Sequence, residues 1–332
     1  PDQSQIPGMI RQSEGQEDPE EEELFEHYSF TAGAGQEPLR VDKFLMNLIR
    51  NATRNKIQKA ARDGNIRVND QAVKQNYKVK PGDTVRVLFE HPPYEYLIQP
   101  EQIPLNIVYE DDSLLVVDKP SGVAVHGGSG ISHGVIELLR AARPELRDLA
   151  LVHRIDRETS GCLVLAKRRS ALRELHERFR EGQVEKNYLA LVVGDWQYGE
   201  QLIDKPLLVE NRKGGERHVI VSKGGKPAQT RVQLSRTFGK YSLLLCAPQT
   251  GRTHQIRVHL QALEFPILGD ERYGDPEQNK LAKKFGLKRL FLHAQSIAFA
   301  DDSGNELHFT APLSDDLEDF LGAGVPKIQG KR

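Results

Sequence analysis

An aspartate flanked by arginines is the group in this sequence best suited to do chemistry. Residues 153–161 read HRIDRETSG, which places Asp156 between two arginines. The runs 149–152 and 162–166 flank this segment, and each has the length and apolar content of a buried strand. We therefore expect a loop at a strand end, where a rigid sheet can aim polar groups and fix a carboxylate beside guanidinium groups. A solvated turn with weak surface ion pairs fits the same residues equally well.

Two further segments decide between these interpretations. Residues 250–260 read TGRTHQIRVHL, a glycine turn that leads into a predicted helix with Ile256, Leu260 and Leu263 on its apolar side. Residues 186–190, which read KNYLA, lie between the other two segments. The three motifs, in this order and at this spacing, resemble the signatures of the RluA-type RNA pseudouridine synthases. The resemblance covers nearly the whole chain from about Leu39.

The resemblance implies that the protein isomerises uridine to pseudouridine in RNA. In this reaction the base leaves C1′ of the ribose, rotates and is rejoined through C5, so nothing enters or leaves overall. The enzyme needs a nucleophile, a proton acceptor for C5 and a pocket for the detached uracil. We expect no cofactor, whether a redox group, a metal ion or ATP. The target nucleotide must first be extruded from its stack.

The resemblance also assigns roles to single residues. Asp156 matches the nucleophile, and Arg257 matches the arginine that pairs with it and whose planar fork can hold a carboxylate bidentately. Such a cation keeps the pKa of a buried carboxyl group low. Tyr188 matches a tyrosine that stacks on the target base and serves in proton transfer. Whether Asp156 attacks the base, attacks C1′ or assists by deprotonation stays open at this point.

Four more residues are expected to bind the substrate or to support the catalytic loop. Arg154 matches the family arginine that replaces the flipped base. His153, Arg252 and His254 are assigned to backbone contacts with the substrate or to support of the loop. From its pattern alone, Tyr188 would be an ordinary core residue.

Composition limits the remaining possibilities. A chain of 332 residues can bury a sizeable core and is expected to hold two domains. Its two cysteines, Cys162 and Cys246, lie inside apolar runs, which argues against a disulfide framework and a zinc cluster. No apolar run reaches the roughly 18 residues of a membrane span, and the N-terminus lacks the pattern of a secretion signal. We expect a soluble cytoplasmic monomer that binds neither metal nor membrane.

The net charge of −1 conceals two oppositely charged segments. Residues 1–37 carry ten acidic residues and one basic residue, whereas residues 38–97 carry twelve basic and six acidic residues. Because the acidic segment has few large apolar residues, residues 1–37 are predicted to form a disordered tail. The basic segment, taken as residues 38–90, is predicted to bind RNA through its phosphates.

The basic segment resembles an S4 domain, a small α/β RNA-binding module. An amphipathic helix is predicted over residues 41–49, and a second helix is predicted from Thr53, as N-cap, to Gly64. Strand-like residues follow at 65–69 and 84–89. The residues expected to contact RNA are Arg40, Lys43, Arg54, Lys56, Lys59, Arg62 and Arg67. A solvated helix face is the alternative interpretation of this charge.

The rest of the chain is predicted to be a proline-rich linker, residues 91–104, and a catalytic domain, residues 105–325. Strand-like segments with short turns alternate with helices such as residues 171–180. This pattern predicts an α+β fold with a mixed, mainly antiparallel sheet and flanking helices, and the family implies a central cleft. The glycine-rich loop at 126–130 lacks the spacing of a nucleotide-binding motif. Its form resembles a branch of the family that acts on the large ribosomal subunit.

The expected substrate is therefore large-subunit (23S) ribosomal RNA. Transfer RNA or another ribosomal RNA site is one alternative, and a non-catalytic RNA-binding protein is another. A protein kinase does not fit, because Asp156 lies one residue too far from His153 for the kinase catalytic loop. A zinc protease does not fit, because His254 and His259 lack the required spacing and glutamate.

Overall fold

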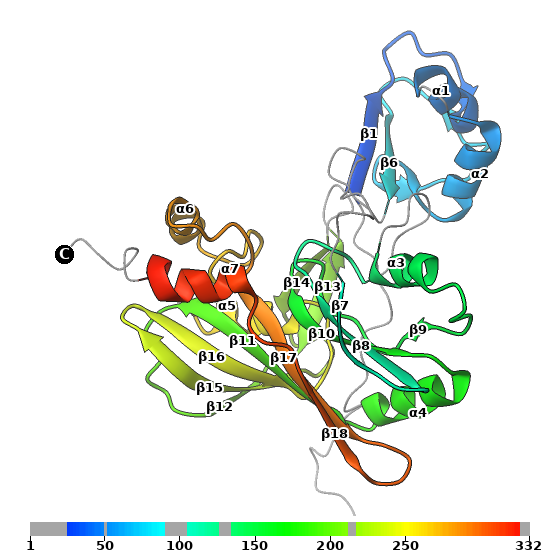
Figure 1. Ribbon diagram of the computed structural model, residues 1–332. Coiled ribbons are helices and arrows are strands. Elements are labelled where there is room, and N and C mark those ends of the chain that lie inside the picture. Colours follow the sequence, from blue (N-terminus) through cyan, green and yellow to red (C-terminus); the bar gives the residue numbers. More distant parts are fainter. Residues whose placement is uncertain (1–24, 50–51, 90–104, 126–133, 212–216, 326–332) are drawn as a thin grey trace, which may run out of the picture.

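The computed structural model describes residues 25–49, 52–89, 105–125, 134–211 and 217–325. They form a small N-terminal module and a large module built on one long sheet (Figure 1). Both modules combine helices with mainly antiparallel strands, which confirms the predicted α+β class. The predicted linker and the glycine-rich loop at 126–130 lie outside the described residues.

The small module packs two helices against short strands. Its elements are β1 (Phe25–Thr31), β2 (Leu39–Arg40), α1 (Val41–Leu48), α2 (Arg54–Arg62), β3 (Ile66–Val68), β4 (Gln71–Ala72), β5 (Lys78–Val79) and β6 (Thr84–Phe89). The strand order is β1-β6-β3-β4, and β2 pairs with β5. Both predicted helices are confirmed, because Phe44 and Leu45 of α1 and Ile57 of α2 are buried in one core. Thr53 caps α2 by accepting a hydrogen bond from the Lys56 backbone N–H at 3.3 Å.

The predicted extent of the acidic tail is wrong for residues 25–37, because β1 pairs antiparallel with β6 along its length. Aromatic side chains in β1 supply apolar contacts that the count of charges concealed. The Phe30 ring lies edge-on to Phe44, with the ring centroids 6.4 Å apart. Glu26, one of the acidic residues in the count, pairs with Arg86 at 2.7 Å. The remainder of the predicted tail lies outside the described residues.

Ten strands of the described part of the large module form one sheet. They are β7 (Asn106–Glu110), β8 (Leu114–Lys119), β9 (Ala150–Leu151), β10 (Ser160–Ala166), β11 (Glu185–Val193), β12 (Gln201–Asp204), β15 (Gln229–Phe238), β16 (Tyr241–Pro248), β17 (Leu292–Ala300) and β18 (Glu306–Thr310). The order is β12-β15-β16-β11-β17-β10-β8-β7, with β9 beside β10 and β18 beside β17. A separate hairpin consists of β13 (Leu207–Asn211) and β14 (Arg217–Val221). The helices are α3 (Val135–Ala142), α4 (Arg169–Arg180), α5 (Gln255–Ala262), α6 (Pro276–Lys284) and α7 (Asp315–Asp319), which a π-helical turn at Phe320–Gly324 extends.

Strands β8 and β10 are covered on both faces. Val116 and Val164 pack in the cluster that contains the apolar side of α4, whereas Val117 and Leu165 pack in the cluster that contains α3. Side chains of a strand alternate between faces, so α3 and α4 lie on opposite sides of this part of the sheet (Figure 1). The prediction of a buried strand at residues 162–166 is thereby confirmed.

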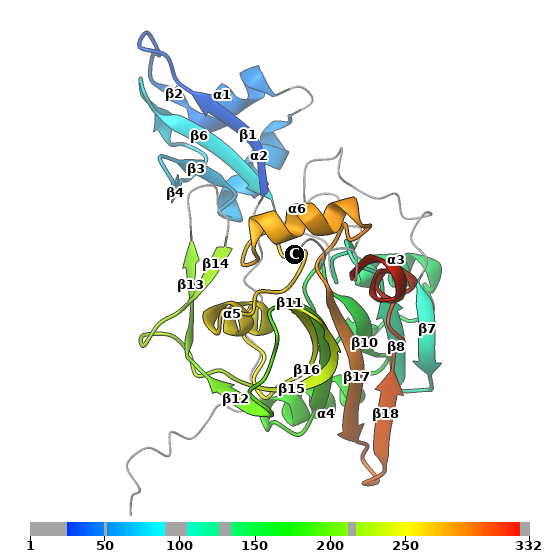
Figure 2. The same ribbon diagram turned by 90° about the vertical axis from the view of Figure 1, so that its left-hand side faces the viewer.

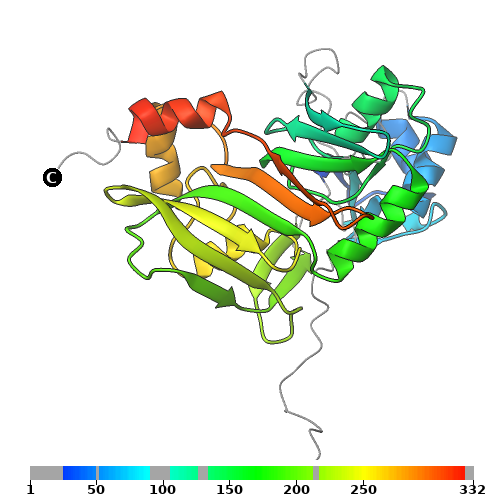
Figure 3. The ribbon, with the colours of Figure 1, turned by 60° about the horizontal axis from the view of Figure 1, so that its bottom comes forward.

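The other half of the sheet curves around α5 (Figure 2). Strands β11, β16 and β15 form the curved layer, and the β13–β14 hairpin packs against α5 through Val219, Val258 and Tyr273. Figure 3 shows the sheet as one continuous twisted layer in which β17, in orange, joins the two halves.

The junction between the halves fixes the start of β10. β10 and β17 form the one parallel pair among the described strands, with Ser160 opposite His293 and Gly161 opposite Ala294. Gly161 has a φ of +116°, and a Cβ atom at this position would lie 2.1 Å from the Ala294 carbonyl oxygen. The position therefore requires glycine. The loop that leads into β10 is held against the middle of the sheet.

Candidate active site

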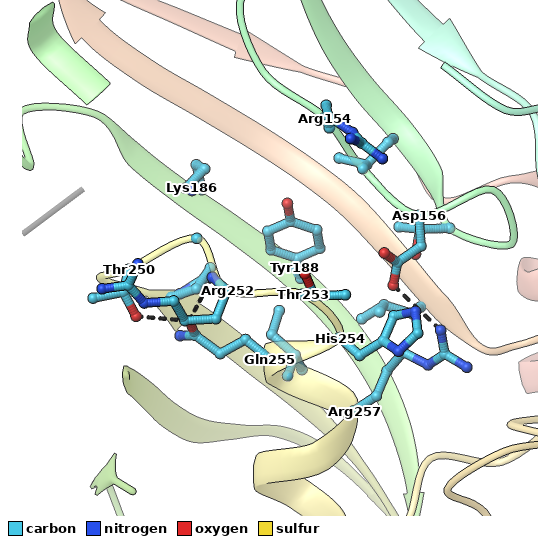
Figure 4. A pocket seen from close by; sticks show the side chains of 16 residues that line it. Arg154, Asp156, Lys186, Tyr188, Thr250, Arg252, Thr253, His254, Gln255 and Arg257 are labelled. Carbon is cyan, nitrogen blue, oxygen red and sulfur yellow. Dashed lines mark hydrogen bonds and ion pairs between the residues drawn. The ribbon is translucent and has the colours of Figure 1, made fainter. Parts of the chain in front are cut away.

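An open cavity of about 120 Å³ lies between the loop before β10, strand β11 and the N-terminal end of α5 (Figure 4). The three sequence motifs meet at this cavity. The predicted site residues that line it are Arg154, Asp156, Tyr188, Arg252, His254 and Arg257. His153 is not among the lining residues.

Asp156 points into the cavity from a loop that hydrogen bonds hold in place. The buried Lys119 Nζ donates to three backbone carbonyl oxygens, among them that of Arg157 at 2.8 Å. Ser121 Oγ donates to the Glu158 carbonyl oxygen at 2.7 Å. Burial lowers the pKa of Lys119 to about 7. The last residue of β8 and the turn after it therefore fix the backbone of the two residues that follow Asp156.

Arg257, in the first turn of α5, lies between two carboxylates. Its Nη1 is 3.4 Å from Asp156 Oδ2, whereas its Nε and Nη2 donate to the two oxygens of Asp270 at 2.8 and 2.9 Å. The bidentate contact expected for Asp156 is thus made to Asp270 instead. The Asp270 side chain has no exposed surface, and a fully buried carboxylate requires complete pairing. Asp156, whose side chain is 30% exposed, receives a single N–H group.

Asp270 was not predicted from the sequence. Backbone N–H groups of Arg272 and Tyr273 also donate to its Oδ1, at 3.0 and 3.1 Å, so the turn that contains Asp270 fixes its side chain. Only an indirect sign in the sequence indicates that such a carboxylate is needed. Arg257 lies in an apolar helical segment with no acidic residue three or four positions away, and a buried arginine then needs a carboxylate from another segment.

The groups around Asp156 keep its carboxyl group ionised. Burial raises the pKa of this group, but positive charge on His254 and Arg257 lowers it by more, so the pKa lies below its usual value of 3.8. Burial also lowers the pKa of His254 to about 4, which leaves the imidazole uncharged at neutral pH. At neutral pH the positive charge that lowers the Asp156 pKa therefore comes from arginines, with a larger contribution from Arg257 than from Arg154.

The buried Tyr273 supports both His254 and Arg257, and it too was not predicted. His254 precedes α5 with a φ of +53°, a left-handed conformation that few non-glycine residues adopt. Its Nδ1 lies 2.7 Å from the Tyr273 hydroxyl oxygen, which also accepts the Val219 backbone N–H at 3.0 Å. The Arg257 guanidinium carbon is 5.1 Å from the centroid of the Tyr273 ring.

Tyr188 and Arg154 face the same space as Asp156 (Figure 4). Tyr188 is paired with Cys246 of β16 on one side and with Ala294 of β17 on the other, so the central strands fix its backbone. Its side chain is partly exposed. An aromatic ring in this place can stack on a planar base next to the carboxylate.

The prediction that His153 contacts the substrate is not supported. His153 is buried, its Nε2 accepts the Val164 backbone N–H at 3.0 Å, and its ring stacks on Phe179. Burial lowers its pKa to about 3, so it is a neutral residue that supports β10. Arg252 does line the cavity, but its Nε donates to the Pro227 carbonyl oxygen at 2.9 Å and so also holds the backbone.

The basic residues predicted to bind RNA have different environments in the small module. The exposed ones are Lys43 of α1 and Arg54, Lys56, Lys59 and Arg62 of α2. Arg40 is held bidentately by Asp42 at 3.2 and 2.9 Å, which neutralises most of its charge. Arg67 is partly buried in β3. The exposed set, rather than all seven residues, forms a candidate RNA surface.

Within the described residues, no group of three or more His, Cys, Asp or Glu side chains could hold a metal ion. Both cysteines are buried free thiols, and burial raises the pKa of each to about 12. Among the described helices, none is both long enough and apolar enough to span a membrane.

Comparison with known proteins agrees with this geometry. Residues 113–262 match the family described as RNA pseudouridylate synthase, and residues 39–85 match the S4 domain. Ribosomal large subunit pseudouridine synthase C of Haemophilus ducreyi is 46% identical over 300 residues, covering 88% of this chain and 94% of that protein. The protein of the same name from Escherichia coli K12 is 45% identical over 302 residues, covering 87% of this chain and 92% of that protein. The solved structure of human RNA pseudouridylate synthase domain containing 4 is 28% identical with a TM-score of 0.55, covering 67% of this chain and 93% of that one. The resemblance expected from the three motifs is confirmed, and the chain belongs to the RNA pseudouridylate synthase family.

Proposed function

We propose that this protein isomerises specific uridines of large-subunit ribosomal RNA to pseudouridine, with Asp156 as the nucleophile and the target nucleotide flipped out of its stack. The observation that carries the proposal is the Asp156 carboxylate, kept ionised next to Arg257 in an open cavity that Tyr188 also lines. The names of the relatives that share 45–46% identity with this chain support the choice of RNA.

The reaction exchanges one bond to the ribose for another. The C1′–N1 bond breaks, a C1′–C5 bond forms, the hydrogen on C5 leaves as a proton, and N1 gains a proton. A carboxylate nucleophile divides this exchange into two easier steps through a covalent intermediate. Asp156 suits this role because a carboxyl pKa below 3.8 leaves it unprotonated at neutral pH. Attack at C1′ and attack on the base both use the Asp156 carboxylate, and the proposal includes both routes.

Arg257 contributes through its fixed position. Asp270 binds two nitrogens, Nε and Nη2, along one edge of the guanidinium group, so the third nitrogen, Nη1, is held toward Asp156 without freedom to rotate away. A preorganised cation of this kind stabilises charge as it moves between the carboxylate and the detached base, and it needs no rearrangement.

Tyr188 and Arg154 are assigned to the nucleotide. Stacking of the uracil on the Tyr188 ring would contribute roughly 1–3 kcal/mol to binding. Arg154, on the opposite side of the cavity opening from α5 in Figure 4, would fill the space that the flipped base vacates.

The two modules divide the work in this proposal. The small module, residues 25–89, binds RNA phosphates through the exposed residues of α1 and α2, and the large module, residues 105–325, carries out the chemistry. The cavity is complete within one chain, so we propose that the protein acts as a monomer. Action on ribosomal RNA places it in the cytoplasm.

Release of tritium tests the reaction. RNA labelled at uridine C5 should lose its label to water with the wild-type protein, whereas Asp156→Asn should bind RNA but release none. Release at the wild-type rate by Asp156→Asn would contradict the proposed nucleophile. Tyr188→Phe keeps the ring and removes the hydroxyl group, so unchanged release by this variant would restrict Tyr188 to stacking.

The RNA target needs a separate test. Pseudouridine mapping in cells that lack this protein should show the loss of specific sites in large-subunit ribosomal RNA. Loss confined to transfer RNA or to another ribosomal site would replace the proposed substrate. RNA binding by the protein without the loss of any site would favour a non-catalytic role.

A further inference from the structure

Helix α4 carries a line of basic side chains outside both the cavity and the small module. Arg169, Arg173, His176 and Arg180 are spaced at i, i+4, i+7 and i+11, so they occupy a narrow strip on one face of the helix. All four are exposed, whereas the opposite side of α4 is buried in the core. At a rise of about 1.5 Å per residue, the strip is roughly 16 Å long. We refer to these four residues as the α4 strip.

The exposed Glu177 lies beside the strip, four residues after Arg173, but no described acidic side chain is fixed against most of the strip. Among the described residues, Arg173, His176 and Arg180 form no ion pair, and Arg169 reaches only Asp148, at 3.5 Å, with both side chains largely exposed. Glu174 lies outside the strip and is engaged by Arg178 at 3.0 Å. The exposed charges do not stabilise the packing of α4, because the helix is held by its apolar residues. The fold therefore does not explain why this face is basic.

The C-terminal end of α4 lies close to the cavity lining. Phe179, which is buried on the core side of α4, lies under the buried Lys186, whose Nζ is 5.5 Å from the centre of the Phe179 ring. Lys186 in turn lines the cavity with Arg154. The C-terminal end of α4, which carries the exposed Arg180, is therefore one side-chain contact away from the cavity lining, and the helix lies on the surface of the large module (Figure 3).

We propose that the α4 strip binds the phosphates of the RNA segment that flanks the target nucleotide. This inference rests on the proposed function, because it takes the substrate to be RNA. Guanidinium groups bind phosphate oxygens bidentately, and three of the four residues in the strip are arginines. A linear row of exposed cations whose Arg180 end lies close to the cavity lining fits a polyanionic strand better than it fits a compact acidic protein surface. The contact would also lie on a different module from the RNA surface of α2.

The double variant Arg173→Gln/Arg180→Gln tests the proposal. Each lost phosphate contact should lower the slope of log affinity against log salt by roughly 0.7–0.9, so the double variant should lose between about 1.4 and 1.8. We expect RNA affinity at about 0.1 M salt to fall by roughly 10-fold or more, with the rate of tritium release at saturating RNA unchanged.

Lys280→Gln/Lys284→Gln on α6 is the matched control. It removes two exposed positive charges, four residues apart, from a helix that lies far from α4 in both Figure 1 and Figure 2. Its affinity and salt slope should remain close to those of the wild type. An equal loss in both double variants would reduce the α4 effect to net charge and overturn the proposal.

The outcomes separate this inference from the proposed function. An unchanged salt slope in the α4 variant would overturn the inference and favour another partner, such as an acidic protein, for the strip. A lower rate at saturating RNA would also overturn it, because the strip would then act on the fold or the chemistry rather than on binding. Absence of tritium release by the wild-type protein would instead refute the proposed function. The comparison of RNA affinity between the α4 and α6 double variants would still test the strip, because it does not depend on turnover.

Discussion

The charges of the cavity and the charges of α2 are held in different ways. In the cavity, the Arg257 side chain is 7% exposed and Asp270 has no exposed surface, whereas on α2 Lys59 is 61% exposed and its partner Asp63 is 38% exposed. Removal of one partner from a buried pair leaves the other charge buried, with neither solvent nor a counter-charge to stabilise it. Exposed pairs contribute only about 0–1 kcal/mol. Substitutions in the cavity should therefore act through geometry and coupling, whereas those on α2 should act through summed charge.

Loss of the buried carboxylate should give the largest difference between the two regions. Asp270→Ala leaves the Arg257 guanidinium buried without its bidentate partner, and we expect the free energy of unfolding to fall by about 3–5 kcal/mol. Urea unfolding followed by circular dichroism measures this change. Asp63→Ala, which removes the exposed partner of Lys59, is the control and should change stability by less than about 1 kcal/mol. Similar losses of unfolding free energy in the two variants would show that the buried pair and the exposed pair contribute equally to stability.

The second largest effect should come from a substitution that preserves the positive charge in the cavity. Arg257→Lys retains the positive charge, but an ammonium group cannot give two parallel N–H groups to Asp270 and another to Asp156. We expect turnover to fall by about 100-fold through misplacement of the carboxylate, with RNA affinity unchanged, as measured by single-turnover tritium release. Arg62→Lys on α2 should leave both quantities unchanged. Full turnover in Arg257→Lys would show that charge alone is sufficient in the cavity.

The dependence of turnover on pH sharpens the same point. Because the pKa of Asp156 is held below 3.8, its ionisation should not limit wild-type turnover between about pH 8 and pH 5. The stability that this ionisation contributes is present above the unfolded pKa and is lost as the pH falls through the lower folded pKa.

Replacement of Arg257 by an uncharged residue should make turnover depend on pH in this range. In Arg257→Gln, burial dominates and can raise a carboxyl pKa by as much as about 3–5 units. The residual turnover of this variant should therefore fall as the pH decreases from about 8 to 5. Single-turnover rates across this range provide the measurement. A variant profile parallel to that of the wild type would mean that Arg257 does not hold Asp156 ionised.

Single substitutions on α2 should have the smallest effects. Lys56→Gln should reduce RNA affinity by a few-fold and lower the slope of log affinity against log salt by roughly 0.7–0.9. Turnover at saturating RNA should not change. The effects of Lys56→Gln and Arg62→Gln should add, because both side chains are exposed and form no shared network. Strongly non-additive losses would show that the charges of α2 are coupled like those of the cavity.

Elements with local causes could be predicted from the sequence. The helices α1 and α2 follow from the spacing of their apolar residues and from the Thr53 cap, and these features lie within a few residues of one another. The catalytic motifs were equally visible, because each is a continuous run of residues. They meet at one cavity because β17 joins β10 to β11 and places the loop before β10 opposite α5.

Features that depend on partners far along the chain could not be predicted. Strand β1 lies in a stretch where acidic residues dominate the composition. Only its pairing with β6 shows that its aromatic side chains are sufficient to hold this stretch in the fold. Asp270 and Tyr273 carry no local sign of their role, because their partners Arg257 and His254 come from a different segment. The choice of Asp270 over Asp156 for the bidentate contact follows from the relative burial of the two carboxylates, which a sequence does not display.

The contact between Gly161 and the Ala294 carbonyl oxygen also limits how this enzyme can be re-engineered. The backbone of β17 fixes the position of the loop that carries Asp156, so the place of Asp156 and the strand order of the sheet cannot be varied independently. Any methyl group added at Gly161 would act as a wedge that moves Asp156 relative to α5. A design that transfers this chemistry to another scaffold must therefore copy a backbone junction as well as a set of side chains.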